Sequence, residues 1–301
     1  MKLKDKFLEE QANKIFRNNY SQKQYLGFTL RFDTDNVEEH IIPHKEIAEK
    51  IADSLQTEGK NFNQSSINQI VREVINKIYN TFSQELEQDG IPRHIIQPHT
   101  NTRKNRWQIL YHWLWDNKYP RWLWDTLKQQ AQQESDRQWI KFSDVGNLDE
   151  NSRGIDIYTE EIKQWKEQRQ HLIHKDRPLT IQINLQTGKH LILINRSQDY
   201  ENNETRYLVV PSPAFAPNLR LSGLNQKIPQ PEAICNDIKF RTPGIEEFIG
   251  ILVDDKFDFS FLDPNQDEAI LQWSDEHLKE IGDHLDRIGN WQVFYKKYTV
   301  V

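Results

Sequence analysis

The sequence predicts an α+β protein with a mainly helical N-terminal domain and a C-terminal antiparallel β-sandwich-like domain. In the first half, apolar residues recur every three or four positions, as on one face of a helix. After Pro178 they alternate with polar residues, as in a half-buried strand. The length of 301 residues suits two domains of ordinary size. We expect a helical Trp-rich domain at 1–140, a linker and connecting helix at 141–176, and a β-sandwich-like domain at 177–301.

Three helices and one strand are expected ahead of the Trp-rich segment. Helical periodicity predicts the three helices at 2–19, 44–55 and 65–86. The pairs Asp89-Gly90 and Ile91-Pro92 end the third of them. Strict alternation predicts a strand over 24–32, with its apolar side formed by Leu26, Phe28, Leu30 and Phe32.

The Trp-rich segment, residues 103–133, is expected to form a helical hairpin at the core of the first domain. It contains Trp-Leu-Trp-Asp twice, at 113–116 and 122–125, on either side of Tyr119-Pro120. A residue before proline avoids helical geometry, and proline suits the first turn of a new helix. The chain should therefore break at Tyr119. Trp122 falls off the apolar face of the second helix, which makes it a candidate for exposure.

The charges of this segment leave two interpretations open. Six basic and two acidic residues lie between 102 and 130, in a chain whose net charge is −6. Aromatic rings with arginines nearby can stack on nucleic-acid bases. Alternatively, the aromatics form the core and the charges form its solvated rim, because helical spacing accounts for nearly all of the Trp residues. The candidate residues for binding protein or nucleic acid are Arg103, Lys104, Arg106, Arg121 and Trp122.

Composition limits the cellular compartments and the classes of function that are possible for this protein. The net charge and a pI near 6.0 argue against a dedicated duplex-DNA binder, which usually carries a basic domain. The single cysteine, Cys235, excludes an internal disulfide and a multi-cysteine metal site. No apolar run approaches the length of a membrane span, and the charged N-terminal segment has no apolar signal core. We therefore expect a cytoplasmic protein that does not bind membranes.

The nearest metal motif is an incomplete calcium-binding loop. Asp149, Asn151 and Glu160 fall at positions 1, 3 and 12 of an EF-hand-like loop. Position 5 is Arg153, a cation where calcium needs an oxygen ligand. Zinc needs three or four converging ligands, whereas each cluster of histidines supplies two. Nucleotide-binding and hydrolase motifs are missing from the sequence. We expect no catalytic residue, no metal and no cofactor.

Short strands and one helix are expected after Pro178. Strands are predicted at 179–186, 191–194, 207–210, 249–253, 257–262 and 291–301, and a helix at 267–288. Several short strands separated by turns are typical of a sandwich.

Turn and apolar residues of the C-terminal segment occur in a distinctive order. They are Pro178 to Ile181, Gly188, Leu191 to Asn195, Tyr207 to Pro211, Phe215, Leu221, Gly223, Ile228-Pro229, Phe240, Pro243-Gly244, Glu246, Phe248 and Trp291. In this order, residues 177–301 resemble a bacterial domain of unknown function, frequent in cyanobacteria. That domain lies at the C-terminus of caspase-like peptidases, protein kinases and other signalling or conflict-system proteins. The resemblance implies a β-sandwich-like accessory module without catalytic residues.

Together these features favour a non-enzymatic protein-interaction or adaptor protein. Upstream of residue 177 the chain shows no peptidase or kinase motif, only the Trp-rich helical domain. The resemblance implies a role as an accessory component of a bacterial signalling or defence system. By the same analogy, its partner would be a caspase-like protease or a kinase. The alternative is a nucleic-acid-binding protein that uses the basic, Trp-rich residues 103–128.

Overall fold

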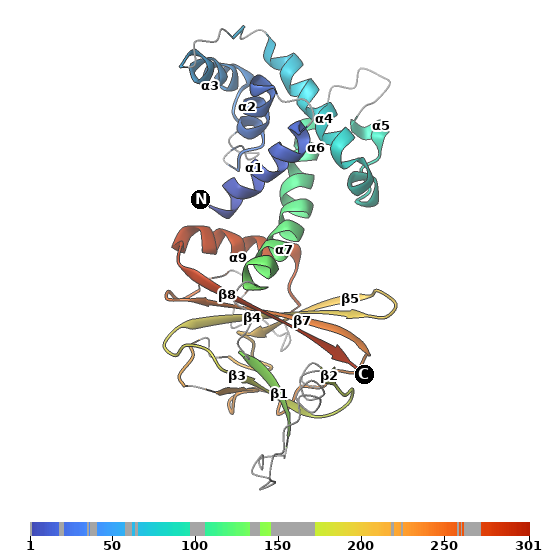
Figure 1. Ribbon diagram of the computed structural model, residues 1–301, viewed down its shortest axis with the longest axis vertical. Coiled ribbons are helices and arrows are strands. Elements are labelled where there is room, and N and C mark those ends of the chain that lie inside the picture. Colours follow the sequence, from blue (N-terminus) through green and yellow to red (C-terminus); the bar gives the residue numbers. More distant parts are fainter. Residues whose placement is uncertain are drawn as a thin grey trace, which may run out of the picture. The chain divides into compact units, whose positions relative to one another are not determined.

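The computed structural model describes most of the chain, in two compact units. The described residues are 2–17, 21–34, 36, 41–57, 62–63, 66–96, 106–132, 139–145, 172–217, 220–223, 225–257, 259, 261 and 272–301. The units are Met1–Trp122 and Leu123–Val301, so the division falls inside helix α7 (Tyr119–Gln132). The first unit is helical and the second is rich in strands, which confirms the α+β class (Figure 1).

The expected linker and connecting helix lie mainly outside the described residues. Residues 146–171 are not described, so this helix stays a prediction. The helix is expected at 159–173, and its last two residues, Leu172–Ile173, form the short strand β2 instead. The predicted boundary at 141–176 also lies further along the chain than the division between the compact units.

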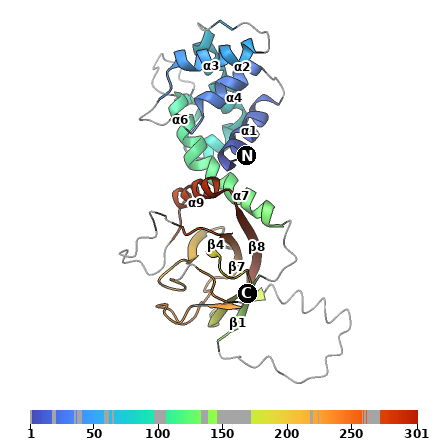
Figure 2. The ribbon, with the colours of Figure 1, turned by 90° about the vertical axis from the view of Figure 1, so that its left-hand side faces the viewer.

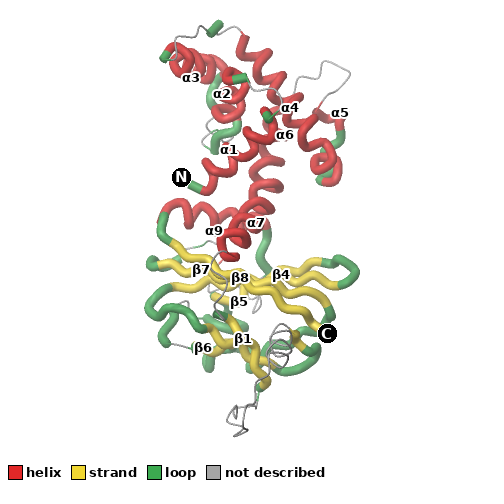
Figure 3. The backbone as a smooth tube through the Cα atoms, in the orientation of Figure 1, coloured by secondary structure: helices red, strands yellow, loops and turns green. Residues whose placement is uncertain are grey.

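Helices form the first unit (Figure 3). They are α1 (Leu3–Phe16), α2 (Gln22–Arg31), α3 (His44–Gln56), α4 (Ile67–Gln88), α5 (Arg93–Ile96), α6 (Arg106–His112), the π-helical turn Trp113–Lys118 and the start of α7. The three predicted helices are confirmed as α1, α3 and α4. Their apolar faces meet in a core that includes the buried residues Phe7, Ile51 and Ile78.

The predicted strand at 24–32 is wrong, because residues 24–31 belong to helix α2 and Phe32 caps its end. Alternating apolar residues masked a helical pattern of burial. The buried positions form two adjacent pairs that lie four residues apart, as on one face of a helix. They are Gly27 with Phe28 and Arg31 with Phe32. A Cβ atom on Gly27 would lie 2.8 Å from Cγ2 of Ile70. The missing side chain therefore lets α2 approach α4 closely.

The predicted helical hairpin is also wrong, because helix α6 continues through the π-helical turn into α7 without a break. Tyr119 has helical angles, φ −62° and ψ −46°, and its N–H bonds to the carbonyl of Leu114, five residues back. Pro120 has no N–H to donate, and its ring crowds the preceding turn of an α-helix. The wider π turn lies just before this proline and lets the helix continue. Burial of Trp113, Trp115 and Tyr119 stabilises that arrangement.

The second unit contains two β-sheets with one apolar core between them. The strands are β1 (Ile140–Asp144), β2 (Leu172–Ile173), β3 (Leu179–Ile183), β4 (His190–Asp199), β5 (Glu204–Val210), β6 (Gln226–Ile228), β7 (Gly244–Val253) and β8 (Trp291–Val300). Three strands pair in the order β1-β3-β6, and five in the order β2-β8-β7-β4-β5. All pairs are antiparallel except β2 with β8. Ile181, Leu193, Phe248 and Phe294 lie in the shared core, as a β-sandwich-like domain requires.

Two helical segments cover the other face of the five-stranded sheet, opposite β1 and β3 (Figures 1 and 2). One is α7 from Leu123 onward and the other is α9 (Asp275–Ile288). Helix α9 starts later than predicted because Ser274 caps it, accepting a hydrogen bond from the backbone of His277. Gly289, with φ +70°, ends it.

In the second unit, the strand predicted at 257–262 differs from the structure, and strands β1 and β6 were not predicted. The described residues of 257–262 are not in a strand; Phe257, Phe259 and Phe261 are buried with their rings against one another. Strand β1 was not expected, since its segment Ile140–Asp144 contains only two apolar residues.

Candidate functional site

Several residues expected to bind ligands or partners lie outside the described part of the chain. These are Arg103, Lys104, Asp149, Asn151 and Glu160. Arg106 is the first residue of α6 and is half-buried. The structure therefore describes three of the five candidate binding residues, namely Arg106, Arg121 and Trp122.

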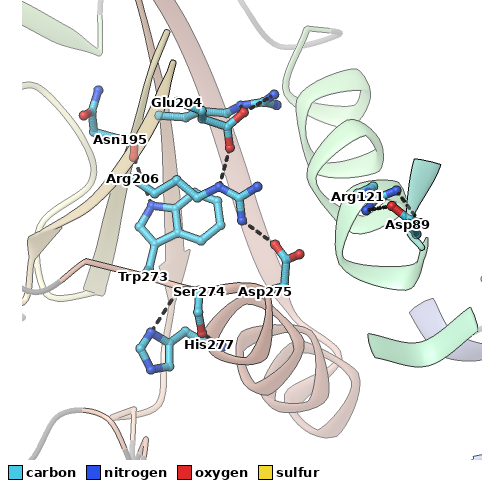
Figure 4. Close-up of polar contacts among 10 residues, drawn as sticks. Asp89, Arg121, Asn195, Glu204, Arg206, Trp273, Ser274, Asp275 and His277 are labelled. Carbon is cyan, nitrogen blue, oxygen red and sulfur yellow. Dashed lines mark hydrogen bonds and ion pairs between the residues drawn. The ribbon is translucent and has the colours of Figure 1, made fainter. Parts of the chain in front are cut away.

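Arg121 forms a two-point ion pair within the first unit (Figure 4). Its Nη1 and Nη2 donate to the two carboxylate oxygens of Asp89, at 3.0 and 2.7 Å. The indole N–H of Trp113 donates to the same carboxylate at 2.8 Å. Burial acts to raise the pKa of Asp89, but the hydrogen bonds from Arg121 and Trp113 outweigh it and lower that pKa. The Arg121 charge is thus neutralised by an acid of the same unit.

Other cations of the Trp-rich segment are engaged in the same way. Lys118 pairs with Glu85 and lies over the ring of Phe82, 4.1 Å from its centroid. Lys128, in the second unit, pairs with Glu247 of β7. These pairs account for cations that the sequence offered as a basic surface.

Trp122 is half-buried, less exposed than its position off the apolar face suggested. Its indole N–H donates to Glu10 at 2.7 Å. Its ring stacks on Tyr119, with centroids 5.8 Å apart, and contacts Phe7 at 5.3 Å. The other tryptophans of the two Trp-Leu-Trp-Asp motifs, at 113, 115 and 124, are buried. In the structure these rings are part of the cores of their units.

A network of arginines, acids and tryptophans covers one end of the five-stranded sheet (Figure 4). Arg196 of β4 and Arg206 of β5 are cross-strand partners, and both pair with Glu204. Arg206 also pairs with Asp275 in the first turn of α9. Burial acts to lower the pKa of Arg206, but the hydrogen bonds that it donates to Asp275 and Glu204 outweigh this effect and raise that pKa.

Two stacked tryptophans complete this network. Trp124 of α7 and Trp273, just before α9, lie with ring centroids 5.3 Å apart. Arg196 lies over the Trp124 ring and Arg206 over the Trp273 ring. The indole N–H of Trp273 donates to the carbonyl of Asn195 at 2.9 Å. The stacked rings and ion pairs attach the two helical segments to the sheet. Among the described residues of this network, each charge has an opposite charge beside it, which leaves no surplus charge for a ligand.

A buried acid lies on the opposite, inner face of the same sheet. Glu246 is 3% exposed, and its carboxylate accepts hydrogen bonds from Asn195 Nδ2 at 2.8 Å and Ser197 Oγ at 2.7 Å. Burial raises the pKa of Glu246 to about 7, although both hydrogen bonds act to lower it. This carboxyl can exchange a proton near neutral pH. Sequence reasoning missed it, although adjacent acids Glu246-Glu247 in an alternating strand must place one side chain on each face.

Among the residues that the structure describes in the second unit, one aromatic side chain is strongly exposed. Tyr200, at the turn between β4 and β5, is 69% exposed. Asp199 fixes this turn: its carboxylate accepts from the backbone N–H groups of Glu201 and Asn203, at 2.9 and 2.8 Å. Asn202 adopts φ +67° there. The Asn202-Asn203 pair indicated this turn in the sequence, but nothing indicated that a tyrosine would be displayed on it.

Within the described ranges, no group of three or more His, Cys, Asp and Glu residues could hold a metal ion. No described helix combines the length and apolar character needed to cross a membrane. Searches for similar proteins agree with one another: the chain matches no protein-family model, no curated protein and no solved structure.

Proposed function

We propose that this protein is a non-enzymatic interaction protein that serves as an accessory component of a bacterial signalling or defence system in the cytoplasm. The observation that carries the proposal is the display of Tyr200 on a fixed hairpin turn. Tyrosine is enriched at protein–protein interfaces because its ring supplies a large apolar contact and its hydroxyl a hydrogen bond.

The rigidity of the turn also supports a binding role. A side chain on a loop that must become ordered pays an entropic cost when it binds. Asp199 already holds this turn through three hydrogen bonds to Glu201 and Asn203, the third from Asn203 Nδ2 at 2.8 Å. Tyr200 is therefore presented on a backbone that needs little rearrangement. By analogy with the accessory domain that residues 177–301 resemble, the partner is a caspase-like protease or a kinase.

The competing function is nucleic-acid binding through residues 103–128. Pairing of Arg121, Lys118 and Lys128 with acids leaves fewer cations of this segment available to phosphates. Binding through the remaining cations Arg103, Lys104 and Arg106 would weaken steeply as salt is raised. It would also be lost when those three residues are replaced together.

The experiment is recovery of the tagged protein from the cells that produce it, with and without nuclease treatment. It is run on wild type, Tyr200→Ala and the control Lys45→Ala, whose side chain is 84% exposed in the helical unit. The proposal expects one protein that persists after nuclease, is retained by Lys45→Ala and is lost with Tyr200→Ala. Recovery of nucleic acid, with co-purifying proteins lost after nuclease, would replace the proposal with the competing function.

A further inference from the structure

The buried carboxyl of Glu246 lies at the base of the hairpin that displays Tyr200. Three register pairs fasten the end of β4 to the start of β7, namely Ser197 with Glu246, Gln198 with Ile245, and Asp199 with Gly244. The strands approach closely there, since a Cβ atom on Gly244 would lie 2.3 Å from the carbonyl oxygen of Gln198. Asp199, which fixes the turn, is thus held by the same strand end that buries Glu246.

The two hydrogen bonds of Glu246 suit a protonated carboxyl. Asn195 Nδ2 lies 2.8 Å from Oε2, which accepts from it in either protonation state. Ser197 Oγ lies 2.7 Å from Oε1, and a hydroxyl can donate to a carboxylate or accept from a carboxylic acid. A proton on Oε1 therefore fits without movement of either side chain. Its loss leaves a charge that burial disfavours, which is why burial raises the pKa of Glu246 to about 7.

Charged and titratable groups of the same sheet surround this carboxyl. Arg196 and Glu247 lie on the outer face, where they contact Trp124 and Lys128 of α7. On the inner face, the partner of Glu246 on β8 is Tyr298, whose hydroxyl donates to a backbone carbonyl of β1 at 2.8 Å. Lys296 is two residues from Tyr298 along β8, and burial lowers its pKa.

Strand β1 brings two more charges from the other sheet. Lys141 is exposed, and Asp144 pairs with Arg177 at 3.7 Å. Burial has the largest effect on the pKa of Glu246, and the hydrogen bonds from Asn195 and Ser197 oppose it. Access of water to this carboxyl therefore decides its protonation state.

We propose that ionisation of Glu246 opens the end of β4 and loosens the turn, so that Tyr200 is presented rigidly only while this carboxyl carries its proton. Separation of the three terminal β4–β7 pairs admits water to the carboxylate, and the end of a strand opens at lower cost than its centre. A loosened turn must be ordered again on binding, which weakens binding as pH rises. This consequence for binding rests on the proposed function, whereas the opening of the hairpin does not.

The direction of the pH effect follows from the two states of the hairpin. The pKa of Glu246 is about 7 in the closed hairpin and returns to its ordinary value of 4.5 once the carboxyl is solvated. Closure is therefore most favoured below about pH 4.5, is lost progressively as pH rises, and changes no further above about pH 7. Over this range the population of the open hairpin rises by about 300-fold at most.

The test measures amide hydrogen exchange of the purified full-length protein from pH 5 to pH 8, in wild type, Glu246→Gln and the exposed control Glu232→Gln. The reporters are N–H groups hydrogen-bonded within the turn, those of Asp199, Glu201, Asn202 and Asn203. Each rate is divided by the Glu246→Gln rate at the same pH, which removes the intrinsic effect of pH on exchange. Between pH 5 and pH 7 this ratio should rise by about tenfold or more in wild type and in Glu232→Gln.

Low concentrations of urea separate local opening from unfolding of the whole domain. Local opening exposes little surface, so exchange in the turn should respond weakly to urea, and exchange at Ile192 and Leu193 in the centre of β4 should respond strongly. A ratio that stays constant with pH would overturn the proposal. So would an equal response to urea at the turn and at the centre of β4.

A second variant keeps the test decisive if Glu246→Gln fails to fold. Ser197→Ala removes a hydrogen bond that acts to lower the pKa of Glu246, so the pH effect should level off at a higher pH than in wild type. Rates are then compared with those of unstructured peptides of the same sequence. Levelling off at the same pH in both proteins would contradict the role of Glu246. These measurements involve no partner, so their outcome is separate from whether Tyr200 binds a protein.

Discussion

Trp124 and Trp273 stack nearly parallel, with ring centroids 5.3 Å apart and an interplanar angle of 18°. Trp124 lies in α7 and Trp273 lies just before α9, so about 150 residues of sequence separate these two packed rings. Arg196 and Arg206, which are cross-strand partners, each lie over one of the two rings. The stack therefore joins both helical segments of the second unit to strands β4 and β5.

The two tryptophans should respond differently to replacement by phenylalanine. Trp273 donates its indole N–H to the Asn195 carbonyl, whereas the Trp124 indole N–H is buried without a partner in the described structure. Trp273→Phe removes a buried hydrogen bond to a carbonyl, and Trp124→Phe removes none. We expect Trp273→Phe to lower the free energy of unfolding by about 1 kcal/mol more than Trp124→Phe. Denaturant unfolding of both variants measures the difference, and equal losses would show that this hydrogen bond contributes nothing.

Glu246 should make stability depend on pH around neutrality. Its pKa is about 7 in the folded protein against an ordinary value of 4.5, so the folded state binds its proton more tightly. The stability that this group contributes is complete below about pH 4.5 and is lost as pH rises through about 7. The change approaches about 3 kcal/mol at most.

The test compares wild type, Glu246→Gln and the exposed control Glu232→Gln in denaturant unfolding from pH 5 to pH 8. Glutamine keeps the shape and cannot ionise, so Glu246→Gln should gain stability relative to wild type as pH rises. Glu232→Gln should follow wild type throughout. A constant difference between wild type and Glu246→Gln across this range would contradict the raised pKa.

Gly250 should not tolerate a side chain. A Cβ atom there would lie 2.8 and 2.9 Å from two ring carbons of Trp139, which is buried in the core between the sheets. The Trp139 ring cannot easily move, because its N–H donates to the Tyr295 carbonyl. Gly250→Ala should cost about 1–3 kcal/mol of unfolding free energy. Gly223→Ala is the matched control, since its Cβ would meet nothing within 4 Å; a similar cost for both would show that Trp139 can shift.

Long periodic segments of the fold could be predicted from the sequence, and segments governed by tertiary contacts could not. In α3 and α4 the buried residues follow the helical period, in α4 over 22 residues. This regular spacing is why the sequence predicts both helices to within a few residues of their ends. The segment at α2 is only 10 residues long, and Leu26, Phe28 and Leu30 happened to alternate. Packing of Gly27 against Ile70 decides in favour of the helix there, and that contact lies 43 positions away in sequence.

The π-helical turn was unpredictable for a related reason. A proline after Tyr119 ordinarily marks a helix end, and local preferences give no reason to expect otherwise. Burial of Trp113, Trp115 and Tyr119 on one continuous helix outweighs the cost of accommodating Pro120. The interpretation of the Trp-rich segment as core depended on spacing alone, and the buried rings agree with it.

The candidate sites could be predicted from the sequence less well than the fold. The sequence alone does not reveal that Arg121 is paired, because its partner Asp89 lies 32 positions earlier, at the end of α4. The sequence places Glu246 and Glu247 on opposite faces of a strand, but only the tertiary structure shows that Glu246 is the buried one. Exposure of Tyr200 likewise depends on how far β4 and β5 extend beyond the core.

Site-specific photo-cross-linking tests the proposed interaction most directly. A photoreactive phenylalanine analogue replaces Tyr200 in one protein and the exposed Lys45 in another, and both are irradiated in the cells that produce the protein. Position 200 should yield one discrete protein adduct, resistant to nuclease, and position 45 should yield none of that size. Absence of an adduct at position 200, or the same adduct from both positions, would contradict the assignment of the β4–β5 turn as a protein-binding surface.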